Sequence, residues 1–163
     1  MFEVLVYVYE NYWRGDACPE LQQLGRKLSA HGFEPEEIQA ALNWLDGLNL
    51  AAQQIQLSPE AAMTAGGSPD GQSPTSLRVY SVAEQDHLGA ECLGFLSFLE
   101  SAGVLPASMR ELVVDRAMAA PGDPVALDEF KIIVLMVYWS CGTELDALVL
   151  DELCDDSSTR LAH

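Results

Sequence analysis

The amino-acid sequence predicts a mainly α-helical protein. The expected fold is an N-terminal winged-helix-like helix-turn-helix with a two-stranded wing (residues 1–80), packed on a C-terminal bundle of about four helices (residues 81–154), with residues 155–163 as a polar tail. Three observations predict this fold. Apolar residues recur at helical spacing, Gly and Pro stand where helices would end or begin, and two short runs alternate with a period of two.

The first segment, residues 1–13, fits either a strand or a helix. Val4, Val6 and Val8 alternate as in a strand, but Glu3 and Glu10 fall within one narrow polar stripe on a helical wheel. Such a stripe is typical of a helix that is buried around most of its circumference, so the helix is favoured.

A helix-turn-helix and a wing are predicted next. One helix carries leucines at helical spacing and ends at Gly32, and the second begins at Glu34-Pro35. The apolar stripe of the second helix is Ile38, Ala41, Leu42, Leu45 and Leu48. After Gly47, residues 54–57 and 77–80 alternate with a period of two, which predicts two strands. Residues 58–76, rich in Pro, Gly and Ser, predict a flexible loop within the wing.

The second half of the sequence predicts helices only. Two capping boxes, Ser81 with Glu84 and Ser108 with Glu111, predict two helix starts, and Pro121–Pro124 breaks the chain. Asp128 then begins a helix with an unbroken apolar run from Ile132 to Trp139, and a last helix is expected near Glu144–Cys154. The apolar run belongs either at the centre of a core or in a subunit interface, so a homo-oligomer is one reading.

Composition restricts the function classes. The chain of 163 residues has 25 Asp and Glu but 8 Lys and Arg, a formal net charge of −17. So few cations cannot form a basic stripe for nucleic acid or an anionic membrane, whereas a basic protein partner suits this charge. Four scattered cysteines without a CxxC pair, and a start without a basic signal region, predict a cytoplasmic protein. The longest uncharged apolar run is too short to span a membrane.

The second helix of the helix-turn-helix, residues 35–48, would be the DNA-reading helix of a winged helix. Its exposed side is predicted to carry Glu36, Glu37, Gln39, Asn43 and Asp46. These carboxylates would repel phosphate, so we expect a non-enzymatic protein–protein interaction module with an acidic docking face. Three alternatives stay open: an ordinary solvated helix face, a nucleic-acid-associated regulator, and a metal-dependent enzyme.

Candidate reactive groups are few. Glu84, His87 and Glu91 would share one helix face, but a metal site of this Glu-x-x-His type needs a second such helix, so a solvated surface is favoured. Cys92 is expected in the core, and Cys141 lies near a helix end that disfavours a thiolate. No catalytic motif is present, and we predict no catalytic residue, no metal and no cofactor.

Several segments match a known family. They are Met1-Phe2-Glu3-Val4-Leu5, Gly32-Phe33 with Ala41-Leu42-x-Trp44-Leu45, Leu77-Arg78-Val79-Tyr80, Gly94-Phe95-Leu96-x-Phe98-Leu99-Glu100 and Leu135-Met136-Val137. Together they resemble the bacterial Smg family over most of the chain, apart from residues 58–76 and the acidic tail. The resemblance implies a proteobacterial cytoplasmic protein from a family of unknown function, often encoded beside a DNA-processing protein. It thereby adds a DNA-processing protein as a partner and transfers no site residue.

Overall fold

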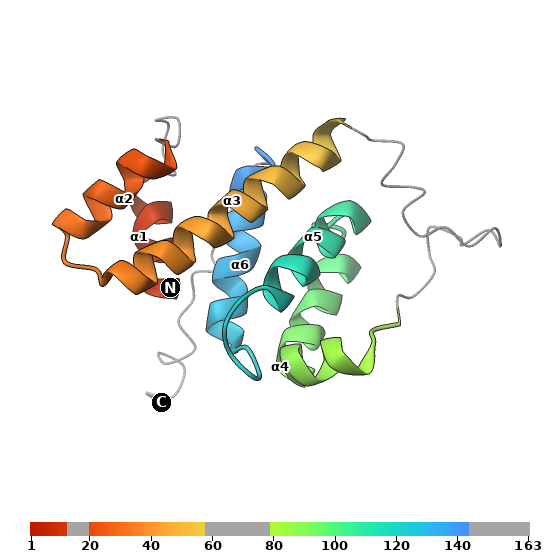
Figure 1. The fold of residues 1–163 in the computed structure, drawn as a ribbon. Helices are drawn as coiled ribbons and strands as arrows, with labels where there is room; N and C mark the ends of the chain where they lie inside the picture. Colours follow the sequence, from red (N-terminus) through yellow and green to blue (C-terminus); the bar gives the residue numbers. More distant parts are fainter. Residues whose placement is uncertain (13–19, 58–78, 144–163) are drawn as a thin grey trace, which may run out of the picture.

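The computed structural model describes residues 1–12, 20–57 and 79–143, which form six α-helices (Figure 1). The helices are α1 (Phe2–Tyr12), α2 (Leu21–Ala30), α3 (Pro35–Leu57), α4 (Val82–Ser101), α5 (Ala107–Met118) and α6 (Leu127–Ser140). No strand occurs within these ranges, which confirms the mainly α-helical prediction. The predicted loop 58–76, the last helix near Glu144–Cys154 and the tail 155–163 lie outside the described residues.

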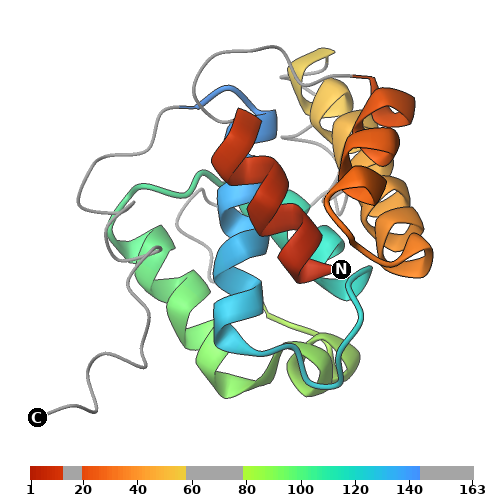
Figure 2. The same cartoon turned by 90° about the vertical axis from the view of Figure 1, so that its left-hand side faces the viewer.

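Helix α6 lies at the centre of the fold. It contacts α1, α3, α4 and α5, and Figure 2 shows α1 crossing one side of it. Its side chains from Phe130 to Tyr138 are buried or nearly so, apart from the half-buried Ile132. The apolar run predicted for a core or a subunit interface is therefore in the core of this one chain.

Buried side chains from all six helices form a single hydrophobic cluster. Helix α1 contributes Val4, Leu5 and Val8, which confirms the helical reading of that segment. Helices α2 and α3 pack against each other as an antiparallel hairpin beside this cluster (Figure 1). The two halves of the chain, predicted as separate units, thus share one cluster, and the boundary between residues 80 and 81 stays a prediction.

The predicted two-stranded wing is wrong. Residues 54–57 form the last turn of α3, which continues through Gly47 for 23 residues in all. Leu48 and Ala52 are buried and Ile55 packs against the same core, and this spacing of four and three residues is helical. Of the second predicted strand, Leu77 and Arg78 lie outside the described residues, and Val79 and Tyr80 are not in a strand. Without a wing, the winged-helix interpretation falls.

The predicted helix ends have mixed outcomes. Gly32 and Gly103 adopt positive φ angles of 93° and 73° after α2 and α4, as a left-handed helix end requires. The Ser81–Glu84 capping box is confirmed, with the Ser81 amide donating to the Glu84 carboxylate over 2.7 Å. The Ser108–Glu111 box is wrong, because α5 begins after Pro106 and the Glu111 carboxylate accepts from Arg110 instead.

Candidate docking face on helix α3

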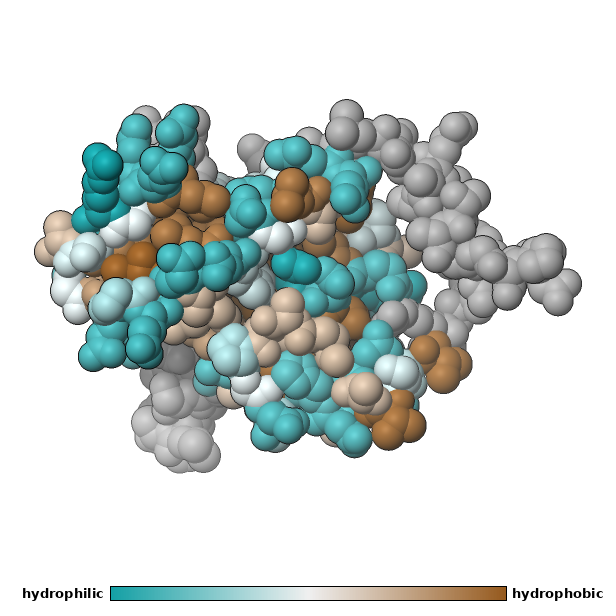
Figure 3. All heavy atoms as spheres, viewed as in Figure 1, coloured by the Kyte–Doolittle hydropathy of each residue, from teal (hydrophilic) through white to brown (hydrophobic). Residues whose placement is uncertain are grey.

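Four of the five predicted docking residues lie in one exposed row on α3. Glu36, Gln39, Asn43 and Asp46 are exposed and separated by three, four and three residues, so they follow one line along the helix. The opposite side of the helix is buried and carries Ile38, Ala41, Trp44, Leu45 and Leu48. In Figure 3, where α3 faces the viewer, hydrophilic surface follows much of this helix and apolar surface gathers between α2 and α3.

Glu37, the fifth predicted residue, is placed differently. Its carboxylate lies 3.5 Å from the amino group of Met1, at the start of α1, and its side chain is 42% exposed. A position next to Glu36 is rotated by about 100° around a helix, because each turn takes 3.6 residues. Glu37 therefore faces α1 and does not belong to the row.

Two side chains of the row are hydrogen-bonded to each other, and the two carboxylates of the row have no ion-pair partner among the described residues. The Gln39 side-chain amide donates to the Asn43 side-chain oxygen over 2.8 Å, so these two amides are held together in the middle of the row. Among the described residues, Glu36 and Asp46 form no ion pair. The row thus presents two solvated carboxylates on either side of a fixed amide pair.

Contacts with α5 hold α3 in place. The indole nitrogen of Trp44, itself 4% exposed, donates to the backbone carbonyl of Arg116 over 3.0 Å. The Arg116 guanidinium lies against Gly47, where an added Cβ would stand only 2.2 Å from Nη1. Helix α5 therefore contacts α3 at two places, through Trp44 on the buried side of α3 and through Gly47 at the edge of the row.

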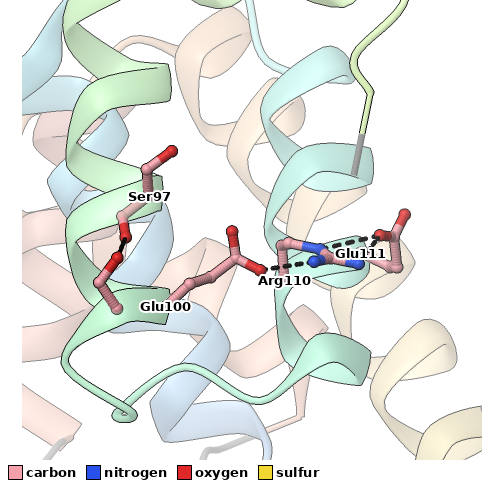
Figure 4. Close-up of polar contacts among 5 residues, drawn as sticks. Ser97, Glu100, Arg110 and Glu111 are labelled. Carbon is pink, nitrogen blue, oxygen red and sulfur yellow. Dashed lines mark hydrogen bonds and ion pairs between the residues drawn. The ribbon is translucent and has the colours of Figure 1, made fainter. Parts of the chain in front are cut away.

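Most of the positive charge in the described part of the chain is held inside the fold. Arg110, Arg116 and Lys131 are three of the five Lys and Arg residues there, and their exposures are 15%, 16% and 7%. Figure 4 shows Arg110 between Glu100 of α4 and Glu111 of α5. Burial lowers the pKa of Arg110, but its hydrogen bonds to these two carboxylates more than compensate and raise it.

The exposed cations of the described residues are Arg26 and Lys27, both on α2. The Lys27 ammonium lies 5.3 Å from the centre of the Tyr12 ring, so part of its charge is directed at an aromatic face. Two neighbouring cations can contact about two phosphates, too few for a nucleic-acid footprint. That the protein does not bind nucleic acid directly stays a prediction, because Arg14, Arg78 and Arg160 lie outside the described residues.

The predicted candidate metal ligands are not brought together. The Glu84 carboxylate caps the start of α4, and His87 Nε2 lies within hydrogen-bond distance, 3.1 Å, of the Ala117 carbonyl. Gly89 then breaks the helix with a φ angle of 70°, which turns Glu91 away from the face of the other two. Across residues 1–12, 20–57 and 79–143, no three His, Cys, Asp or Glu side chains are arranged to hold a metal ion.

Of the two described thiols, Cys92 is buried and Cys141 is half-buried. Cys92 is 1% exposed, as predicted for a core residue, and desolvation together with Glu91 and Glu129 raises its pKa to about 11. Burial also raises the pKa of Cys141. A thiol with a raised pKa is a poor nucleophile at neutral pH, so neither has the character of a reactive cysteine. None of the described helices combines the length and the apolar character needed to cross a membrane.

Sequence reasoning missed one residue of the exposed row. Leu50 follows Asp46 by four residues and is 55% exposed, which is unusual for a large apolar side chain. The signal was present in the spacing of residues 36, 39, 43, 46 and 50, but it was hidden because the helix was expected to end near Gly47.

Comparison with known proteins gives relatives along the whole chain. The family model described as "Protein of unknown function (DUF494)" matches residues 1–163. Proteins named "Protein Smg homolog" from Leptothrix cholodnii and Methylibium petroleiphilum are 60% and 59% identical, and each alignment covers 100% of both chains. The protein of the same name from Bordetella pertussis is 47% identical with the same coverage. No solved structure matches this chain.

Proposed function

We propose that this chain, which belongs to the Smg family of proteins of unknown function, is a non-enzymatic protein–protein interaction module of the cytoplasm. Its docking face is the row of Glu36, Gln39, Asn43 and Asp46. The observation that carries the proposal is that Glu36 and Asp46 stand exposed, without ion-pair partners among the described residues, on a helix that α5 holds in place. A preorganised charged surface loses little conformational entropy when a partner binds.

Charge supports a partner with a basic surface. The chain has a formal net charge of −17, and most described cations are internal, so a positively charged protein would be attracted at long range. A DNA-processing protein with a basic DNA-binding surface has this chemistry, and α3 would then occupy a surface that otherwise meets phosphates. The nucleic-acid alternative depended on the wing, and with helix in its place no observation favours it.

The experiment compares two double variants with the same net charge. Glu36→Lys/Asp46→Lys reverses the row, and Glu10→Lys/Asp86→Lys reverses two exposed carboxylates on α1 and α4. Tagged full-length proteins are cross-linked in cells, and the recovered proteins are quantified by mass spectrometry. We expect the first variant to lose a partner by about tenfold or more while the second retains it.

Two results would contradict the proposal. One is a partner set that the row variant keeps unchanged, and the other is an equal loss in both variants, which would show that net charge alone matters. The purified complex should also dissociate as salt is raised to about 0.5 M, since screening weakens contacts between solvated charges. Circular dichroism confirms that each variant is folded.

A further inference from the structure

Building on the proposed function, we infer that the segment docking on α3 is a basic amphipathic α-helix of another protein, which lies along the row and seats an apolar residue on Leu50. The row, extended by Leu50, is Glu36, Gln39, Asn43, Asp46 and Leu50. Helices α1, α2, α5 and α6 contact α3 from its other sides.

The spacing of the row fits a helix as the occupant. Its members are separated by three, four, three and four residues, the alternation that forms the seam between two helices packed side by side. At a rise of about 1.5 Å per residue, the row is about 21 Å long, with neighbouring members about 5 Å apart. An extended peptide places same-face side chains about 6.8 Å apart, so its side chains would not stay opposite the members of the row. A helix of about 15 residues matches both the length and the spacing.

Leu50 gives the surface an anchor of a different chemistry. It is one of five large apolar side chains exposed in the described residues, and of these it alone lies in the row. Its flanking positions Asn49 and Gln53 are exposed and polar. An apolar side chain bordered by polar groups is the usual form of an interface anchor, which loses water on binding while its surroundings remain partly solvated.

A second copy of this chain does not fit as the occupant when the two rows overlap along their whole length. Two copies related by an antiparallel twofold axis would place Leu50 against Glu36, and a parallel arrangement would place each carboxylate against itself. Neither pairing is favourable. The occupant must instead carry Lys or Arg opposite Glu36 and Asp46, polar side chains opposite the Gln39–Asn43 pair, and an apolar residue opposite Leu50.

Two synthetic peptides test this inference. Both are helical and have the same composition, but in one the order basic, polar, polar, basic, apolar follows the spacing of the row, and in the other these residues are scattered around the helix. Binding to the full-length protein is measured by fluorescence anisotropy. We expect the patterned peptide to bind about tenfold more tightly or better.

Variants of the protein then measure the contribution of Leu50 to the affinity for the patterned peptide. Leu50→Ala should weaken binding of the patterned peptide by about tenfold, whereas Val82→Ala, which truncates an apolar side chain that is 73% exposed on α4, should leave it unchanged. Both changes are on the surface, so both proteins should fold, and circular dichroism checks this. Equal affinity for the two peptides, absence of binding, or an unchanged affinity of Leu50→Ala would overturn the inference.

The failure of this inference is distinguishable from the failure of the proposed function. If Glu36→Lys/Asp46→Lys weakens binding of both peptides equally and Leu50→Ala has no effect, the face binds basic helices but does not select one whose side chains match the spacing of the row. If charge reversal changes the affinity of neither peptide, the docking face itself is wrong. Loss of selectivity between the peptides in Leu50→Ala, with residual binding that charge reversal removes, supports both.

Discussion

At the scale of single residues, Gly47 is informative because it lies inside a helix. Gly is a poor helix former, and residues 54–57 beyond it alternate with a period of two, which predicts a strand and not a continued helix. The structure shows that the missing side chain makes room for the Arg116 guanidinium. Nothing near Gly47 in the sequence points to Arg116, which arrives from α5. A contact between residues so far apart in the chain cannot be predicted from local patterns.

Replacing Gly47 therefore sets two effects against each other. Ala is favoured over Gly inside a helix by up to about 1 kcal/mol. In this protein the new methyl group would stand 2.2 Å from Arg116 Nη1, so the guanidinium would have to move. We expect Gly47→Ala to be neutral or destabilising by up to about 2 kcal/mol in the native background. Urea unfolding measures the change.

The matched control is an Arg116→Ala background, in which the guanidinium that would collide with the new methyl group is absent. In an Arg116→Ala background, Gly47→Ala should stabilise the protein by about 0.5–1 kcal/mol, because only the helix preference remains. The Trp44 hydrogen bond is made to the backbone carbonyl of residue 116, so Arg116→Ala retains it. An identical effect of Gly47→Ala in the two backgrounds would show that the guanidinium contact is energetically irrelevant.

At the scale of elements, α4 contains two glycines with opposite requirements. Gly89 has a φ angle of 70° and kinks the helix, whereas Gly94 lies beyond the kink and its missing Cβ would meet nothing within 4 Å. The ψ angle of Gly89 is 169°, and this combination of φ and ψ is essentially restricted to glycine, so an L-residue there costs about 1–3 kcal/mol. Gly89→Ala should therefore destabilise the protein by about that amount, and Gly94→Ala should stabilise it by up to about 1 kcal/mol.

Thermal and urea unfolding of the two variants test this difference within one helix. A Gly89→Ala protein as stable as the native one would mean that α4 straightens without cost. Since the kink separates Glu91 from Glu84 and His87, straightening would also bring these three side chains onto one face.

The elements were predictable where the local pattern was long and regular. Helices α1, α2, α4 and α6 follow from apolar spacing, glycine ends and the Ser81–Glu84 box. The end of α3 was not predictable, because four alternating residues fit a helix as well as a strand. The packing of the buried Ala52 and the partly buried Ile55 against the core decides for the helix. The docking row was predictable up to Asp46, because its residues follow the regular spacing of the helix. The position of Glu37 was not predictable, because it depends on the contact with α1. Leu50 was missed because the helix was expected to end near Gly47.

At the scale of the whole molecule, charge is the dominant feature. A formal net charge of −17 makes the folded state repel itself, and the ion pairs of Arg110 and Arg116 are partly buried and therefore less sensitive to salt. We expect added NaCl to stabilise the protein. Between about 0.01 and 0.15 M, the gain should be on the order of 1 kcal/mol, or about 2–4 °C in Tm.

Calorimetry across this salt range checks the expectation, with KCl as a second salt to separate screening from ion-specific effects. A variant in which Glu10 and Asp86 are replaced by Gln and Asn should show a smaller dependence on salt, because it carries less net charge. A Tm that stays constant or falls over this range would mean that attractive ion pairs outweigh the self-repulsion.

The central position of α6 has a consequence for how the protein is made. Ribosomes synthesise α1 to α5 before α6 (residues 127–140), and four of these five helices contact α6. Until the residues of α6 leave the exit tunnel, the apolar surfaces that pack against α6 are uncovered and stay accessible to chaperones. A nascent chain halted before Leu127 would therefore be aggregation-prone, because the core is not complete until α6 is present.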